Sequence, residues 1–228
     1  MLLNQMLRSS SSRFYLHKYV ETNSRTITIP SSIRSGDLAV LISFGQRTGT
    51  TQNCSVSLST GFTQRATDFA GSGFSTTGVT CVVATNILSG SEGGNSAYGL
   101  SDHTYTNYVT TLLIFRQAEG FTSISVGTTS DASSNNSSGQ SLSYPSNTEI
   151  LPFILIATAA IDDGWSSEES SISASTLSNQ YYSGTNLTSI FVCIRHTNTQ
   201  SSDTISSDLS PGTTSHYNFL NICTIQPV

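Results

Sequence analysis

Hydrophobic residues in this chain gather in short runs separated by Ser-, Gly- and Asn-rich stretches. Three runs alternate between apolar and polar residues: TITI at 26–29, SVSL at 55–58 and FTSISV at 121–126. Six others are mainly apolar: 38–44, 79–85, 108–116, 150–159, 188–196 and 217–225. Alternation is typical of a strand with one solvated face, whereas a continuous apolar run indicates a strand covered on both faces. We therefore predict an all-β chain that forms a single antiparallel β-sandwich of about eight or nine strands.

Little helix is expected, because no window of the sequence sustains a period of 3.6 residues. Short helical turns are predicted only near 88–94 or 168–175. The low-complexity run SDASSNNSSGQS at 130–141 is predicted to be a mobile loop. No internal repeat is visible, and no linker is long enough to divide the chain. The sequence thus predicts one sandwich domain at 23–228.

Residues 1–22 precede the sandwich pattern and are predicted to be an N-terminal arm or pre-strand. Apolar and aromatic side chains in this segment would let it dock on a partner or on the body: Phe14, Tyr15, Leu16 and Tyr19. An extended arm can add apolar and main-chain contacts over a large area without a second folded domain.

Composition narrows the possible partners. Charged residues make up only 10% of the chain, and the net charge is −5 with 9 Lys plus Arg. Nucleic-acid binding requires basic stripes that neutralise phosphates, so no nucleic-acid partner is expected. The longest apolar run, 150–161, is too short for a membrane-spanning helix, and the N-terminal apolar run is too short for a signal peptide. No membrane association is predicted.

The four cysteines form no CxxC pair that would indicate a zinc or redox site. Cys81, Cys193 and Cys223 lie inside apolar strand runs. We therefore predict that these three are small core residues and not disulfide partners.

Candidate chemistry is sparse. The segment IDDGWSSEES at 161–170 places four acidic residues around the single tryptophan, Trp165. A Ca²⁺ site or a glycosidase carboxylate pair are the alternatives to a solvated loop, but the spacing matches neither. No GxSxG elbow is present to activate a serine. We expect no catalytic residue, metal or cofactor, and hence no enzyme. Trp165, Tyr181 and Tyr182 could instead form a carbohydrate or protein contact surface, or pack at strand edges.

An ordered series of short motifs spans nearly the whole chain. TITIP is followed by GDLAVLISFG at 36–45 and by a Gly61-Phe62-Thr63 corner. Ala84-Thr85 through Gly93-Gly94, LLIFRQAEG at 112–120 and NICTIQPV at 221–228 come next. This series resembles the jelly-roll-like β-sandwich module of tailed-bacteriophage and prophage structural proteins. Phe62 stands where that module has Trp, and Arg116-Gln117 replaces Arg-Gly.

The resemblance implies a non-enzymatic virion component and offers no catalytic residue to transfer. A capsid decoration or cement protein on the particle surface is the expected role, assembled in the host cytoplasm. Its partners would be the major capsid protein or a tail protein, together with further copies of itself, with a trimer as one arrangement. The alternative is a tail-fibre or receptor-binding module that recognises host surface glycans.

Overall fold

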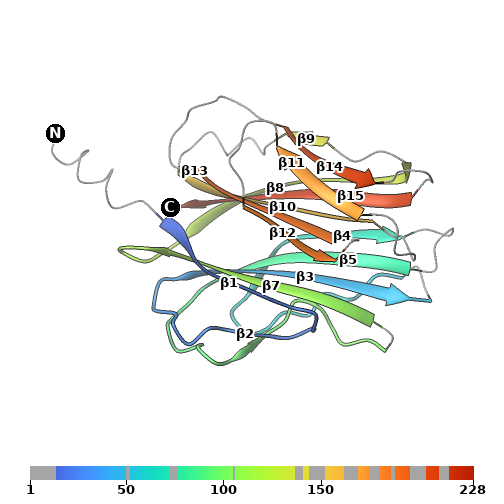
Figure 1. Cartoon of the computed structure of the whole chain (residues 1–228). Helices are drawn as coiled ribbons and strands as arrows, with labels where there is room; N and C mark the ends of the chain where they lie inside the picture. The colour runs from blue at the N-terminus through green and yellow to red at the C-terminus, as the bar shows by residue number, and fades with distance from the viewer. Residues whose placement is uncertain are drawn as a thin grey trace.

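The computed structural model describes residues 14–49, 52–71, 77–104, 106–136, 141–143, 152–161, 169–174, 180–185, 188–195, 204–210 and 216–228. These residues form fifteen strands and no helix, so the part described also holds no helix that could cross a membrane. Every strand pairing is antiparallel, and two five-stranded sheets face each other (Figure 1). The predicted all-β sandwich is confirmed.

The first sheet comes from the N-terminal half of the chain, with strand order β1-β7-β3-β5-β4. Its strands are β1 (Phe14–Thr22), β3 (Leu38–Thr48), β4 (Thr63–Gly71), β5 (Thr77–Ile87) and β7 (Thr106–Gln117). The outer face of this sheet carries a two-stranded ribbon that appears at the bottom of Figure 1. The ribbon consists of β2 (Ile27–Thr28) and β6 (Ser96–Ala97).

The second sheet comes from the C-terminal half, with strand order β12-β13-β10-β15-β8. Its strands are β8 (Ile124–Asn136), β10 (Phe153–Ile161), β12 (Gln180–Thr185), β13 (Thr188–Arg195) and β15 (His216–Pro227). A small third sheet covers its outer face: β9 (Ser141–Ser143), β14 (Thr204–Ser210) and β11 (Glu169–Ala174). Between the two large sheets, β4 packs against β15 and β8, and β5 packs against β10.

The two halves have the same topology. Replacing β1, β3, β4, β5 and β7 by β8, β10, β12, β13 and β15 converts the strand order of the first sheet into that of the second. The outer strands correspond too, because β9 pairs with β14 as β2 pairs with β6. The prediction that the chain has no repeat is therefore wrong at the level of topology. The chain changes from one large sheet to the other once, so jelly-roll alternation between sheets does not describe its connectivity.

Strands that are apolar on both faces are explained by this layering. On β3, Leu38, Val40, Ile42 and Phe44 face the cluster between the large sheets, whereas Ala39 and Leu41 face the outer cluster under β2 and β6. On β10, Ile154 and Ile156 face inward, and Phe153 and Leu155 face the third sheet. The predicted double coverage of these runs is confirmed.

Some strand predictions differ from the structure. The segment 55–58, predicted to be a strand, forms only an isolated bridge between Val56 and Leu100, and the next strand is β4. Other strands were missed because they are polar. Residues 130–136, expected in a mobile loop, continue β8 because they pair with β15. Residues 137–140 lie outside the described part. Residues 169–174 form β11 instead of a helical turn, and residues 88–94 form an irregular loop with a turn at Gly93-Gly94.

Of the two alternatives predicted for the N-terminal segment, arm or pre-strand, residues 14–22 follow the second. Residues 14–22 are an edge strand that pairs with β7, and residues 1–13 lie outside the described part of the chain. Phe14 is 1% exposed, and its ring centroid lies 5.8 Å from that of Phe121 in the cluster between the sheets. The burial of Phe14 explains why this segment joins the sheet and does not remain free.

All four edge strands of the large sheets have a shift in register that marks a β-bulge or similar irregularity. The register shifts between Leu16 and Lys18 on β1, between Gln64 and Ala66 on β4, within β12, and in the pairing of β8 with β15. A bulge twists an edge strand and hinders the addition of a further strand. Partners of this protein are therefore expected to contact its faces and loops.

All four cysteines are buried and none forms a disulfide, as predicted for Cys81, Cys193 and Cys223. Burial raises the pKa of Cys54 to about 11 and those of Cys81 and Cys223 to about 12. Since the thiolate is the reactive form, we expect the native protein to resist a thiol reagent such as DTNB at mildly alkaline pH. Denaturant should expose all 4 thiols. Glu119→Cys, on an exposed turn, is the control that should react at once; rapid labelling of the unmutated native protein would contradict this burial.

Candidate functional site

The residues predicted to contact a partner do not share one surface. Phe14 is buried, and Leu16 and Tyr19 also pack against the cluster between the sheets. Tyr15 points outward from β1 and is 53% exposed. Tyr181 and Tyr182 lie in β12 opposite Phe191 and Ile190, but their side chains are outside the described part, as is all of Trp165. The hypothesis of a partner-contacting aromatic cluster is thus wrong for Phe14, because its ring belongs to the core.

Most of the acidic segment 161–170 lies outside the residues that the structure describes. Asp162, Asp163 and Glu168 lie outside the described residues, and Glu169 begins β11. Among the residues that the structure does describe, no group of three His, Cys, Asp or Glu side chains could hold a metal ion.

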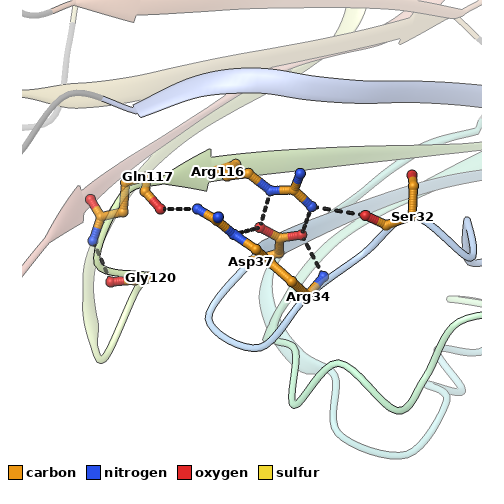
Figure 2. A network of polar contacts seen from close by, with 6 residues as sticks. All are labelled: Ser32, Arg34, Asp37, Arg116, Gln117 and Gly120. Carbon is orange, nitrogen blue, oxygen red and sulfur yellow. Dashed lines mark hydrogen bonds and ion pairs between the residues drawn. The ribbon is translucent and has the colours of Figure 1, made fainter.

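Asp37 organises a polar network at the start of β3 (Figure 2). Its side chain is 1% exposed and receives two hydrogen bonds from Arg116, from Nε to Oδ1 at 2.8 Å and from Nη2 to Oδ2 at 2.6 Å. The backbone N–H of Arg34 also donates to Oδ2, at 2.9 Å. Arg116 Nη2 reaches the carbonyl of Ser32 at 2.9 Å. A fork-to-fork pair of this kind fixes geometry as well as charge.

The network continues to the segment where the chain passes between the two large sheets. Arg34 Nη2 donates to the carbonyl of Gln117 at 2.6 Å, and Gln117 Nε2 donates to the carbonyl of Gly120 at 2.6 Å (Figure 2). The N–H of Phe121 donates to the carbonyl of Gly36 at 2.7 Å. These bonds anchor the crossing segment on the start of β3.

Gly36 and Gly120 make this junction possible. Their φ angles are +82° and +76°, in the left-handed region that favours glycine. A Cβ atom on Gly36 would lie 2.6 Å from the Cα atom of Gly120, so the two backbones touch. The glycines of the GDLAVL and FRQAEG motifs therefore serve close backbone packing.

The electrostatics of the network indicate a permanent ion pair. Burial alone would raise the pKa of Asp37. The hydrogen bonds from Arg116 and the Arg34 N–H, together with both arginine charges, lower the pKa by more than burial raises it, so the pKa lies below its usual value. The hydrogen bond to Asp37 raises the pKa of Arg116. Both groups stay charged at neutral pH, so this arrangement holds structure together and does not transfer protons.

A second candidate is a pocket of about 260 Å³ beside the β2–β6 ribbon. The buried side chains of Ile29 and Phe62 contribute apolar surface to it. Its polar lining includes Asn86 at the end of β5, Asn95 and Ser96 near β6, and Tyr98 after β6. The pocket thus combines segments that lie far apart in the sequence.

Backbone contacts hold the walls of this pocket in place. Ser59 and Tyr98 are joined by three bonds: Ser59 N–H to Tyr98 C=O at 3.1 Å, Ser59 Oγ to the same carbonyl at 3.1 Å, and Tyr98 N–H to Ser59 Oγ at 2.6 Å. The guanidinium of Arg25 lies 4.8 Å from the Tyr98 ring centroid. The sequence pattern singled out the Gly61-Phe62 corner but could not place Asn86, Asn95 or Tyr98 beside it.

Among the described residues that line this pocket, Glu92 is the only acidic one, and it shapes the adjoining turn. Its carboxylate accepts hydrogen bonds of 2.9 Å from the N–H groups of Ser89 and Gly90. Burial raises the pKa of Glu92, but these bonds outweigh that effect and lower the pKa overall. The carboxylate is therefore ionised at neutral pH and already committed to backbone donors.

Comparison with protein-family models and with curated protein sequences gives no match for this chain.

Proposed function

We propose that this protein is a non-enzymatic structural component of a tailed-phage virion, located on the particle surface as a capsid decoration or cement protein. The proposal rests on the motif series that resembles the phage module. Gly36, Asp37, Arg116 and Gly120 belong to those motifs, and all four meet in the network that anchors the crossing segment. The motif residues are thus used to hold a rigid body together, as expected of a structural module.

The partners in this proposal are the major capsid or a tail protein and further copies of the chain itself. The bulged edges of the large sheets disfavour strand addition, so contacts would use the faces and loops of the body or the segment 1–13. The docking-arm hypothesis is now confined to residues 1–13, because residues 14–22 belong to the first sheet.

Particle association tests the proposal. We expect the full chain to co-sediment with particles of the encoding phage that lack this protein, and immunogold labelling to place it on the head. Deletion of residues 1–13 removes none of the contacts described above and should abolish loading if the arm docks. Lys18→Ala, a surface change on β1, is the control that should load normally.

Two outcomes would contradict separate parts of the proposal. Full loading by the truncated chain would reject the arm while leaving the structural role in place. Failure of the unmutated chain to associate with any particle component would reject the virion role itself. Labelling of the tail instead of the head would replace decoration with a tail-associated role.

A further inference from the structure

The pocket beside the β2–β6 ribbon presents polar groups that the protein does not use. Within the described part of the chain, the side chains of Thr60, Asn86, Asn95 and Ser96 form no hydrogen bond with the protein, nor does the hydroxyl of Tyr98. Amides and hydroxyls both donate and accept hydrogen bonds. Such groups converging on a concave surface with an apolar floor are the usual composition of a small-molecule site.

The site is rigid before any ligand arrives. Gly61 has a φ of +87°, and a Cβ atom there would lie 2.8 Å from Asn86 Nδ2, so the corner packs directly against the Asn86 side chain. Asn95 is fixed by its backbone alone, since its N–H donates to the Glu92 carbonyl at 2.9 Å and its carbonyl accepts from Ile29 N–H at 2.9 Å. Preorganised walls reduce the entropy lost on binding.

The charges of the site select against anions. Among the described residues that line the pocket there is no lysine or arginine, and the one ionised side chain is the Glu92 carboxylate. Arg25 is not part of this lining, and its guanidinium lies against the Tyr98 ring. A phosphate or carboxylate ligand would find no cationic partner in the lining and would be repelled by Glu92. A neutral ligand that is rich in hydroxyl groups meets no such penalty.

Size and shape narrow the ligand further. A volume of about 260 Å³ lies just below the usual range for drug-sized ligands, and the pocket is open to solvent on one side. One sugar ring matches these properties, because its C–H face can contact Ile29 and Phe62 while its hydroxyls meet Asn86 and Asn95. The open side would let the rest of a glycan chain extend into solvent.

We propose that this pocket is a binding site for one neutral saccharide unit, with Ile29 and Phe62 as its apolar floor and Asn86, Asn95 and the Tyr98 hydroxyl as its hydrogen-bonding groups. This function goes beyond a structural role in the particle and does not depend on where the protein is located. It also uses residues different from the Trp165 and Tyr181/Tyr182 loops that the sequence suggested for glycan contact.

Binding of methyl glycosides to the full chain tests the site. The probes are the methyl glycosides of glucose, galactose, mannose, N-acetylglucosamine and N-acetylgalactosamine, each titrated by NMR. We expect at least one to bind in the millimolar range and to shift amide resonances of residues 59–62 and 86–98. Asn95→Ala removes an exposed side chain and keeps its backbone bonds, and should weaken binding about tenfold. Thr60→Trp should fill the pocket and abolish binding.

Asn107→Ala is the matched control. Asn107 is an exposed asparagine paired with Gln46, at the opposite end of the first sheet from Asn86, and its substitution should leave the affinity unchanged. The thermal unfolding midpoint of each variant shows whether it is folded.

The proposal is overturned if no probe binds, or if Asn95→Ala and folded Thr60→Trp bind like the unmutated chain. Loss of binding in Trp165→Ala without loss in Asn95→Ala would also overturn it. Particle loading by Asn95→Ala should stay normal, which separates this test from the virion role.

Discussion

Replacing Asp37 by asparagine is expected to lower the free energy of unfolding by about 3 kcal/mol, because it removes one partner of a buried ion pair. The Asp37 side chain is 1% exposed and receives hydrogen bonds from Arg116 and from the Arg34 N–H. Both partners are donors, so the amide group of asparagine would place a further donor against one of them. The crossing segment would lose its anchor at the same time. Urea denaturation at neutral pH measures the change.

Glu119→Gln is the control for this experiment. Glu119 is an exposed acidic residue in the turn that follows Gln117, and its neutralisation changes the net charge by the same amount. A surface substitution of this kind normally alters stability by no more than about 0.5 kcal/mol. Equal stability of the Asp37→Asn and Glu119→Gln proteins would show that the ion pair does not hold the junction.

The stabilising effect of Asp37 should also depend on pH. Burial is the largest single effect on the pKa of Asp37 and raises it. The hydrogen bonds from Arg116 and the Arg34 N–H, with the arginine charges, together outweigh burial, so the pKa in the folded protein lies below the ordinary value of 3.8. A group with a depressed pKa stabilises the folded state above its unfolded pKa, and this contribution disappears as the pH falls through the folded pKa. The stability difference between the original protein and Asp37→Asn should therefore be constant near neutral pH and shrink below pH 3.8. A difference that persists unchanged in strong acid would contradict the assignment.

Local patterning predicted the buried strands well because their sequences record coverage on two faces. The run 38–44 becomes the centre of β3, and 150–159 becomes most of β10. Polar strands such as β4 and β11 have no continuous apolar run in their sequences, since they are stabilised by pairing with β5 and β14. The pattern of apolar and polar residues within a strand does not reveal which other strand it pairs with. Strands that depend on such pairing were therefore missed.

The repeated topology was invisible because equivalent positions exchange large and small residues. In the first half, Phe44 on β3 pairs with Val109 on β7. At the corresponding place in the second half, Ala160 on β10 pairs with Phe219 on β15. Each pair joins one phenylalanine to a smaller apolar residue, but the phenylalanine lies on the other strand of the pair. Cores constrain total volume more strongly than the identity of each residue, so a repeat can persist without sequence similarity.

The candidate sites illustrate the same limit. Asp37 and Arg116 each belong to a motif that the sequence singled out, but they are separated by 79 residues, and their pairing follows only from the register of β3 and β7. The pocket depends on loops whose Ser, Asn and Thr residues resemble those of every other loop in this chain. Its signal in the sequence was the Gly61-Phe62 corner, and the fold was needed to bring Asn86, Asn95 and Tyr98 to it.

Replacing Phe14 by alanine should destabilise the protein by about 3–5 kcal/mol, the usual cost of removing a buried aromatic ring. Phe14 is 1% exposed, contacts Phe121 and belongs to the cluster between the two large sheets. Removing residues 1–22 should have a larger effect, because it deletes β1 and uncovers the edge of β7. Deletion of residues 1–13 removes none of these contacts. Urea denaturation of the purified variants measures all three changes.

Lys18→Ala, an exposed position on the same strand, is the matched control and should change stability by no more than about 0.5 kcal/mol. The comparison decides between two interpretations of the N-terminal segment. If Phe14→Ala were as stable as Lys18→Ala, residues 14–22 would behave as a detached arm, which is one of the two alternatives that the sequence pattern left open. Their aromatic side chains would then again be candidates for partner contact. A large loss confined to Phe14→Ala would instead show that this strand completes the first sheet, because only a ring packed between the sheets leaves a cavity when it is removed.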